Sequence, residues 1–351
     1  MSQARRVLVV TSGALFVRGG HMVIAEETAS ALRRAGHEAE VFVTPQNRFG
    51  RQMSAYVANW LTDVGQTADG RAIDQVISFR YPSYAVRHPR HVCWLNHRMR
   101  EYYDLWERFT RGLGRRGRLK ERVRRWLVHG VDRRLLTRNV TRLLAQSRTI
   151  QDRLRRFGEI GSEVLYPPPP ERPYRTETYG DYVFAVSRLH PLKRLDLLVE
   201  AAGATREAGL AFKIAGTGPM EAELRARIAA LGLDGRVTLL GNVSDAQLID
   251  HYARCRAVFF APWQEDYGFV TLEAFRSGKA VLTAPDSGGP AELVVHGRNG
   301  LVSEPTPAAM AAAIDSLVAD PVLARRLGEQ ARLDASEHTW ERAVSVLLAP
   351  S

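Results

Sequence analysis

Residues 265–274 read EDYGFVTLEA, and this stretch decides how the second half of the chain is organised. It follows the apolar run AVFFAP at residues 257–262, which is short, rich in Val and Phe and closed by proline, as a buried parallel strand is. Gly268 then breaks the run, and the residues after it favour a helix. The pattern predicts a strand, a loop that carries Glu265, and a helix whose first turns carry Glu273.

The start of this predicted helix offers a site for an anion, flanked by two carboxylates. Backbone N–H groups of residues 268–271 would lack acceptors within the helix, and such groups bind diphosphates well. Carboxylates repel an anion, so Glu265 and Glu273 are better suited to the neutral hydroxyls of a sugar and a ribose. The alternative is a solvated loop glutamate and an ordinary exposed helix glutamate.

The composition is typical of a folded protein with two domains. The chain has 351 residues, of which 45% are hydrophobic and 25% are charged. With two cysteines, Cys93 and Cys255, and no His/Cys cluster at metal-ligand spacing, neither a disulfide framework nor a zinc site is expected. The sequence has no pattern of a signal peptide or a membrane span, so we expect a cytoplasmic protein.

The first half predicts an α/β domain. Residues 6–10 and 39–43 are short apolar runs with a helix-like segment at 23–35 between them, which is the pattern of a parallel β-α-β unit. The loop before that helix contains three glycines, which let a ligand approach the backbone. Their spacing is not GxGxxG, which disfavours a dinucleotide site, and a plain tight loop is the alternative.

Two further strands are expected at residues 74–79 and 91–95, and the second runs into Asn96, His97 and Arg98. Ligands of open α/β sheets lie at the carboxyl ends of the strands, so these three side chains are placed where ligands bind. A structural histidine is the alternative for His97.

The segment 108–142 carries the positive charge of the chain. It holds thirteen Lys and Arg against Glu121 and Asp132, so its local charge of +11 equals the net charge of the whole protein. An apolar stripe at residues 126–128 and 135–136 is interleaved with the basic residues, which suits a helix lying on an anionic membrane surface. Nucleic acid is a second candidate partner, although no recognised motif accompanies it, and a solvated arginine-rich face is the third interpretation.

Four consecutive prolines at residues 167–170 separate the two halves, because they exclude both a helix and a central strand. Before them, residues 140–156 have a helical pattern and residues 164–166 a strand pattern. We therefore expect a first domain at 1–166, a linker at 167–180 and a second domain at 181–337. In the second domain, strands and helices alternate five times, which predicts a parallel sheet with helices on both faces.

Arg188 and Lys193 follow the first strand of the second domain. Two long cations in a loop at the carboxyl end of a strand can converge on one diphosphate and neutralise it as it leaves. As an isolated pair they would more often be ordinary surface charges. A glycine-rich turn, GTGP at 216–219, precedes the next helix and is a weak signal by itself.

Together these motifs resemble glycosyltransferase family 4, whose members are retaining enzymes of the two-domain GT-B architecture. The resemblance rests on Arg188 and Lys193, on the Glu-x7-Glu pair Glu265 and Glu273, on GGPAE at 288–292, and on Gly19-Gly20 and Gly36-His37. It implies an α/β fold with two Rossmann-like α/β/α domains that face each other across a cleft. It also implies that a C-terminal helix at about 338–351 packs back on the first domain, which would bind the acceptor.

The resemblance implies a role for each motif residue. Arg188 and Lys193 would bind the donor diphosphate, Glu265 the donor sugar and Glu273 the ribose. The other implied donor contacts are Gly20, Gly268, Phe269, Val270 and Thr271, with Gly241, Asn242 and Val243 near the base; Thr271 departs from the residue more common in the family. His97 aligns with the histidine that approaches the transferred sugar, and it joins Asn96 and Arg98 in the implied acceptor site. The implied catalytic group is His97, Arg188, Lys193 and Glu265.

By this resemblance the protein is a metal-independent, retaining hexosyltransferase. It would move a mannose- or glucose-type hexose from a UDP- or GDP-sugar, such as GDP-mannose, to a hydroxyl of a glycan, a lipid-linked or a small-molecule acceptor. The implied setting is envelope glycan, polysaccharide or glycolipid synthesis, with no cofactor and no nucleic acid. The implied location is cytoplasmic, with peripheral attachment to the inner face of the membrane through 108–142 as a further expectation.

Three other classes stay open at this point. A hydride-transferring nucleotide enzyme is opposed by the missing GxGxxG and by the paired glutamates. A nucleotide-sugar isomerase or epimerase of the same architecture would keep the phosphate-binding residues. A non-catalytic module that binds membrane or nucleic acid through the basic segment would show salt-sensitive binding and no turnover.

Overall fold

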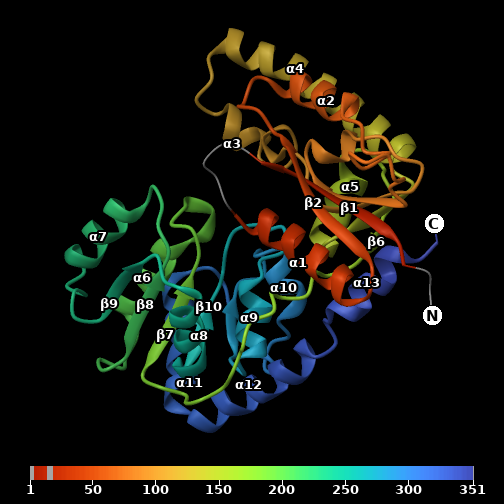
Figure 1. Ribbon diagram of the computed structural model, residues 1–351. Helices are drawn as coiled ribbons and strands as arrows, with labels where there is room; N and C mark the ends of the chain where they lie inside the picture. The colour runs from red at the N-terminus through yellow and green to blue at the C-terminus, as the bar shows by residue number, and fades with distance from the viewer. Residues whose placement is uncertain (1–3, 14–18, 351) are drawn as a thin grey trace. The chain divides into compact units, whose positions relative to one another are not determined.

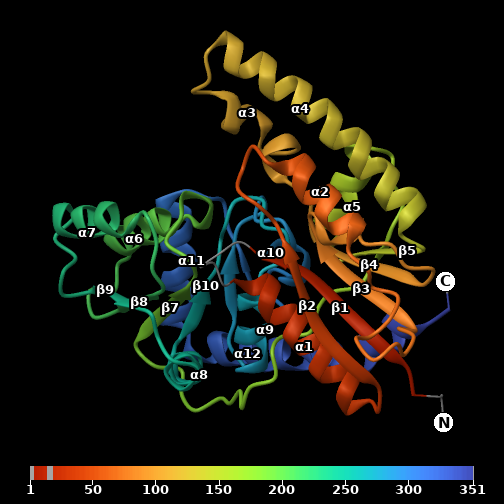
Figure 2. The same cartoon turned by 45° about the horizontal axis from the view of Figure 1, so that its top comes forward.

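The computed structural model describes residues 4–13 and 19–350, and its chain divides into two compact units (Figure 1). Unit 1 comprises Met1–Pro167 and Thr339–Ser351, and unit 2 comprises Pro168–His338. Each unit contains a six-stranded parallel sheet flanked by helices (Figures 1 and 2). The predicted α/β fold with two Rossmann-like domains is therefore confirmed. Residues 14–18 of the predicted glycine loop lie outside the described residues.

In unit 1 the chain changes direction across the sheet between its first and third strands. The strand order is β2-β1-β3-β4-β5-β6, and all neighbours are parallel. Because β2 lies on one side of β1 and β3 on the other, the sheet has a switch point between β1 and β3, where such sheets bind ligands. The strands are β1 (Arg6–Gly13), β2 (Glu38–Pro45), β3 (Gln75–Arg80), β4 (His91–His97), β5 (Arg142–Ala145) and β6 (Glu163–Val164).

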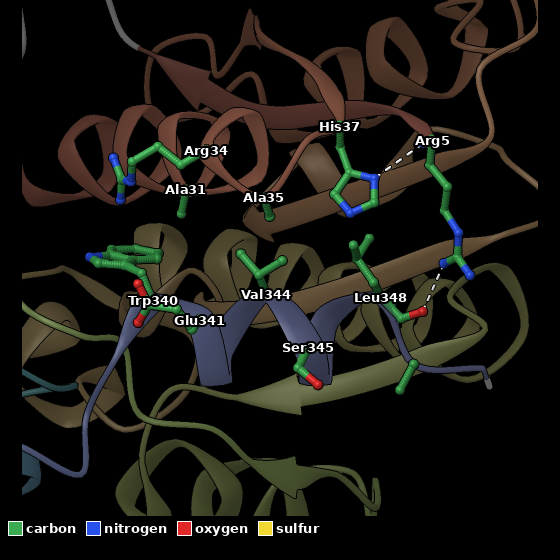
Figure 3. Close-up of a pocket in the computed structure, with 11 residues that line it drawn as sticks. Arg5, Ala31, Arg34, Ala35, His37, Trp340, Glu341, Val344, Ser345 and Leu348 are labelled. Carbon is green, nitrogen blue, oxygen red and sulfur yellow. Dashed lines mark hydrogen bonds between the residues drawn. The ribbon is translucent and has the colours of Figure 1, made fainter. Parts of the chain in front are cut away.

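The α-helices of unit 1 include one from the far end of the chain. They are α1 (Gly20–Arg34), α2 (Gln52–Leu61), α3 (Trp106–Thr110), α4 (Arg115–Arg134), α5 (Arg148–Arg156) and α13 (Trp340–Leu348). Trp340 of α13 packs edge-on against Trp94, with 6.3 Å between ring centroids. A cavity of about 610 Å³ lies between α1 and α13, with Ala31 and Val344 on opposite walls (Figure 3). None of the predicted site residues lines this cavity.

The prediction of one helix over residues 140–156 is wrong. The strand β5 comes first, and α5 starts only at Arg148, where the Ser147 hydroxyl caps it by accepting a 3.2 Å hydrogen bond from the Ile150 N–H. Leu144 and Ala145 are fully buried between β4 and β6. Pairing and burial in the middle of a sheet thus override the local helical pattern of Leu and Arg.

Unit 2 has a second switch point, between β7 and β10. Its strand order is β12-β11-β10-β7-β8-β9, again with all neighbours parallel. The chain runs outward from β7 through β8 to β9 and then returns to the other side of β7 as β10. The strands are β7 (Tyr182–Val186), β8 (Ala211–Ala215), β9 (Val237–Gly241), β10 (Ala257–Phe259), β11 (Val281–Thr283) and β12 (Gly300–Val302).

Helices follow the strands of unit 2 as the alternation predicted. They are α6 (Leu195–Ala204), α7 (Glu221–Ala230), α8 (Asp245–Arg254), α9 (Val270–Arg276), α10 (Gly289–Leu293), α11 (Pro307–Ala319) and α12 (Pro321–Ala335). Across the described ranges, no single helix is long and apolar enough to cross a membrane. Pro307–Ala319 and Pro321–Leu348, bent by 99° at their junction, meet the criteria of length and composition only as a pair.

Candidate active site

The loops that follow β7 and β10 are joined by a backbone hydrogen bond. The Trp263 N–H donates to the Leu192 carbonyl at 2.8 Å, directly across the switch point of unit 2. In this position the Lys193 ammonium lies 2.7 Å from the Glu265 carboxylate. The structure thus brings together a cation predicted to bind diphosphate and a carboxylate predicted to bind sugar, at the edge of the sheet where ligands are expected.

Arg188 is exposed in the loop after β7, and a turn after β8 fixes its backbone. The Leu189 N–H donates to the Thr217 carbonyl at 2.9 Å. Gly216 has a φ of +123°, and a Cβ there would lie 1.9 Å from the Ser187 carbonyl oxygen. Only glycine can occupy that position. Arg188 forms no ion pair with any residue in the described ranges, so its guanidinium is open to an anionic ligand.

Glu265 is held from its other side by the loop after β11. Its N–H donates to the Ser287 carbonyl at 2.9 Å, and its carbonyl accepts from the Gly289 N–H at 3.0 Å. Gly288 has a φ of +73°, and a Cβ there would lie 2.3 Å from the Glu265 carbonyl oxygen. The double glycine of the predicted motif therefore allows a second loop to pack directly on the glutamate backbone.

Glu273 is buried in the first turn of α9, which contradicts the alternative of an exposed helix glutamate. Its two oxygens accept hydrogen bonds from the Arg172 guanidinium at 2.7 Å and the Tyr252 hydroxyl at 2.9 Å. Burial raises the pKa of the Glu273 carboxyl, while the Arg172 charge and the two hydrogen bonds oppose that rise. Arg172 also pairs with Asp245 at 3.1 Å. The carboxylate is therefore held in one orientation before any ligand arrives.

The backbone turns at Gly268, whose φ is +81°, and α9 begins at Val270. The first regular helical hydrogen bond runs from the Glu273 N–H to the Phe269 carbonyl at 2.9 Å. The amides of Phe269 and Val270 come before this bond, so they have no acceptor within the helix. Thr271 differs from the prediction in two respects. Its N–H donates to the Gly268 carbonyl at 3.4 Å, and its hydroxyl is buried with no hydrogen-bond partner among the described residues.

The predicted base-contacting loop lies beside the Gly216 turn. The Gly216 N–H donates to the Gly241 carbonyl at 2.7 Å, while Asn242 is exposed and Val243 half-buried. Donor-site candidates thus follow one another along the carboxyl edge of β9, β8, β7 and β10. Within the described parts of the chain, no group of three or more His, Cys, Asp or Glu is placed to hold a metal ion.

The predicted acceptor residues lie at the end of β4 in unit 1, and they turn in different directions. Asn96 donates to the Gln146 side chain at 3.0 Å, and the His97 Nδ1 lies 2.7 Å from the Arg98 carbonyl oxygen. Arg98 is buried, with its guanidinium 3.8 Å from the centroid of the Tyr103 ring. Packing on Tyr103 accounts for the position of Arg98, whereas Asn96 and His97 stay half-buried at the edge.

Four residues near these sites were not predicted: His21, Arg80, Arg172 and Tyr252. His21 follows Gly20 in the first turn of α1, and Arg80 is the register partner of His97. Burial and the nearby charges of Arg80 and His97 lower the pKa of His21 to about 4. The sequence signals were the position of His21 after the double glycine and that of Arg80 after a strand. Nothing local marked Arg172 or Tyr252.

Two solved structures illustrate the likeness of the whole chain to proteins with this two-domain fold. HepE from Anabaena, crystallised with UDP and glucose, has a TM-score of 0.70 and 21% identity, and the match covers 97% of this chain and 99% of that one. WaaG, a glycosyltransferase involved in lipopolysaccharide biosynthesis, has a TM-score of 0.72 and 17% identity, with 97% of this chain and 100% of that one covered. These likenesses assign the fold to the GT-B class.

The family follows from the sequence of unit 2. Residues 173–334 match the family model of glycosyl transferases group 1, so unit 2 belongs to this family, the GT4 type that its motifs resemble. D-inositol 3-phosphate glycosyltransferase of Rhodococcus erythropolis is 32% identical over 173 residues, which is 46% of this chain and 39% of that one. Human alpha-1,3/1,6-mannosyltransferase ALG2 is 33% identical over 115 residues, or 33% of this chain and 27% of that one. The chain spans less than half the length of these two curated relatives.

Proposed function

We propose that the protein is a glycosyltransferase that moves a sugar from a nucleoside-diphosphate sugar to an acceptor hydroxyl in glycan biosynthesis. The observation that carries this proposal is the Lys193–Glu265 pair at the switch point of unit 2, between exposed Arg188 and the start of α9. Cations and free amides suit a diphosphate, and carboxylates suit hydroxyls. The names of the relatives, for transfer involving inositol phosphate and mannose, support the same class.

The donor we propose is a UDP- or GDP-linked hexose of the glucose or mannose type. HepE crystallised with UDP and glucose supports the first pairing, and the mannosyltransferase relative supports the second. A diphosphate would compete with Glu265 for Lys193, because it brings more negative charge than one carboxylate. Donor binding would then free the oxygens of Glu265 to accept hydrogen bonds from the sugar hydroxyls.

We further propose transfer with retention and without a metal ion. The bond between the anomeric carbon and the diphosphate oxygen breaks, and the acceptor oxygen bonds to the same face of that carbon. The acceptor proton passes to the leaving diphosphate. Arg188, Lys193 and the amides before α9 would stabilise the negative charge that grows on the diphosphate, which is the role of a divalent cation in other transferases.

Unit 1 is proposed to bind the acceptor, with Asn96 and His97 at the edge of its sheet. The acceptor class stays open among glycan, lipid-linked and small-molecule alcohols. By the family resemblance, His97 is the residue we expect nearest the reacting sugar, and the contact of its Nδ1 with the Arg98 carbonyl oxygen holds its ring.

A thermal-shift screen against UDP, GDP and their hexose conjugates tests the donor proposal, because a ligand that binds only the folded state raises the melting temperature. One nucleotide series should stabilise the wild type. Glu273→Gln should lose most of that stabilisation, whereas Glu223→Gln on α7, a glutamate far more exposed to solvent, should keep it. Release of UDP or GDP on addition of an acceptor extract is the turnover assay. Nucleotide binding without any transfer to an acceptor would contradict the proposed function.

A further inference from the structure

We propose that the outward face of α4 docks the protein on an anionic lipid bilayer. This surface belongs to unit 1 and contains none of the predicted donor or acceptor residues. The inference therefore concerns where the protein works, and it can be tested without turnover.

The first observation is an apolar row on the solvent side of α4. Leu119, Val123 and Trp126 are spaced by four and three residues, which places them on one face of the helix. They are 63%, 53% and 73% exposed. The side of α4 that faces the core instead carries Glu121, Val128 and Asp132, all buried. A surface helix of a globular protein normally turns its apolar row inward. Here that row is turned outward.

Buried hydrogen bonds fix the helix in this rotation. Asp132 accepts hydrogen bonds from the hydroxyls of Tyr56, of Tyr84 at 2.5 Å and of Tyr103 at 2.7 Å. Burial raises the pKa of the Asp132 carboxyl, and the charge of Arg98 and the three tyrosine hydroxyls oppose that rise.

A second buried acid holds the other half of the helix. Glu121 accepts from the Tyr102 hydroxyl at 2.7 Å and pairs with Arg124 at 2.6 Å. Rotating α4 to bury Trp126 would bring both acids to the surface and leave four tyrosine hydroxyls without acceptors, which is costly in a protein interior. The outward apolar row is therefore a fixed feature of unit 1.

The same arrangement separates the charges of α4. Both acidic residues of the helix point inward, so its exposed face carries positive charge only. The exposed basic residues are Arg115, Arg116, Arg118, Lys120, Arg122, Arg133 and Arg134. On a bilayer, the cations of this surface would contact anionic headgroups. The adjacent row of Leu, Val and Trp would reach the boundary between the headgroups and the acyl chains.

The neighbouring helix α2 contributes a second apolar row. Met53, Val57 and Leu61 are exposed on it, and the helix contains no charged residue. The hydrogen bond from Tyr56 to Asp132 places α2 next to α4, as Figure 2 also shows. Nucleic acid would satisfy the arginines but would leave both apolar rows in water. A bilayer satisfies the arginines and the apolar rows together.

Sedimentation of the full chain with phosphatidylcholine vesicles, with and without phosphatidylglycerol, tests this inference. Wild type should bind only the anionic vesicles. The triple variant Arg116→Gln/Arg122→Gln/Arg133→Gln should bind on the order of 100-fold more weakly, since each basic residue contributes roughly fivefold near the surface. The triple variant Leu119→Gln/Val123→Gln/Trp126→Gln keeps every charge and should bind at least about tenfold more weakly than wild type.

Helix α12 provides matched controls, because Arg325, Arg326 and Arg332 are exposed on it together with Val322 and Leu333. Glutamine at the three arginines, or at the two apolar positions, should leave vesicle binding within about twofold of wild type. Since all the replaced side chains are exposed to solvent, we expect unchanged melting temperatures and unchanged nucleotide binding in every variant. These two readouts separate lost docking from lost folding and from failure of the proposed function.

A direct readout is the emission of Trp126, taken as the difference between wild type and Trp126→Phe. It should shift to shorter wavelength on anionic vesicles, as expected of an indole that enters the headgroup region. Three results would overturn the inference: wild type that does not sediment with anionic vesicles, α12 variants as impaired as the α4 variants, or full binding by the apolar variant with displacement by heparin. The last result would indicate a general polyanion site.

Discussion

The carboxyl edges of the two sheets are built in different ways. In unit 2 the loops after β7, β8, β10 and β11 are joined by backbone hydrogen bonds, with the ion pair of Lys193 and Glu265 across the switch point. In unit 1 the Tyr81 N–H also donates to the His97 carbonyl at 3.3 Å, but side-chain contacts set the direction of the other acceptor candidates: Asn96 on Gln146, and Arg98 on Tyr103. A site fixed by backbone needs glycines and charges at set spacings. A site fixed by side chains can change with each substitution. We therefore expect the residues at the edge of unit 1 to differ between enzymes that use different acceptors.

The largest effect should come from removing the cation at the switch point of unit 2. Lys193→Met should lower kcat by about a thousandfold, because the leaving diphosphate loses a charge that stabilises it in the transition state. Steady-state kinetics with the identified donor measure the loss. Lys213→Met is the matched control. Lys213 lies in β8 and packs on the ring of Tyr182, so its replacement should leave kcat unchanged. A Lys193→Met variant whose kcat is within tenfold of wild type would contradict the proposed donor site of unit 2.

Two glycines with the same φ angle differ in how closely another segment of the chain approaches them. Gly288 and Gly297 both have a φ of +73°, but a Cβ would meet the Glu265 carbonyl oxygen at 2.3 Å only in Gly288→Ala. Gly297→Ala should cost about 1 kcal/mol of unfolding free energy, the strain of a positive φ. Gly288→Ala should cost about 3 kcal/mol and weaken donor binding, because the loop after β10 must shift. Equal losses in urea unfolding would show that the contact with Glu265 is unimportant.

Arg172 and Arg175 lie three residues apart in the segment before β7, and they test whether Glu273 needs a fixed partner. Arg172→Met removes the guanidinium from buried Glu273, which should cost about 2 kcal/mol of unfolding free energy. Donor affinity should fall roughly tenfold, because the carboxylate keeps only Tyr252 to orient it. Arg175→Met breaks exposed pairs with Glu177 and Asp250 and should change neither quantity measurably. Titration calorimetry and chemical unfolding measure both.

Unit 1 should also give the stability of the protein a pH dependence. His91 is fully buried with its Nε2 2.8 Å from the Ser78 hydroxyl, and burial lowers its pKa to about 3. Between about pH 6.5 and 3 the unfolded chain binds a proton that folded His91 does not, so the free energy of unfolding decreases by about 1.4 kcal/mol for each unit that the pH falls. His91→Asn should flatten this slope relative to wild type. His296→Asn, which replaces an exposed histidine of unit 2, should leave it unchanged.

The sequence predicted unit 2 well because its constraints are local. Alternating strands and helices, the glutamates seven positions apart and the double glycine each leave a pattern in the chain. Arg172 leaves none, because it reaches Glu273 across 101 residues from a stretch without regular structure. Glu273 itself could be placed on a helix, but its burial depends on Tyr252 from a different helix.

In unit 1 the sequence did not show in which direction the side chains point. The position of Arg98 after a strand indicated the edge of the sheet, yet stacking on Tyr103 turns it inward. The charge and apolar content of α4 predicted an amphipathic helix, but not which side faces the core. Three tyrosines from different segments decide that through Asp132. The periodicity of the α4 sequence cannot show which face is buried when residues so distant in the chain determine it.

The cluster around Asp132 also orders the folding of unit 1. Its tyrosine partners lie 76, 48 and 29 residues earlier in the chain. Contacts over such separations form only after the intervening chain has been closed into loops, whose entropic cost comes first. We therefore expect α4 to be seated late, once α2, β3 and the segment around Tyr103 are in place. A mutation at Asp132 should then speed unfolding far more than it slows folding.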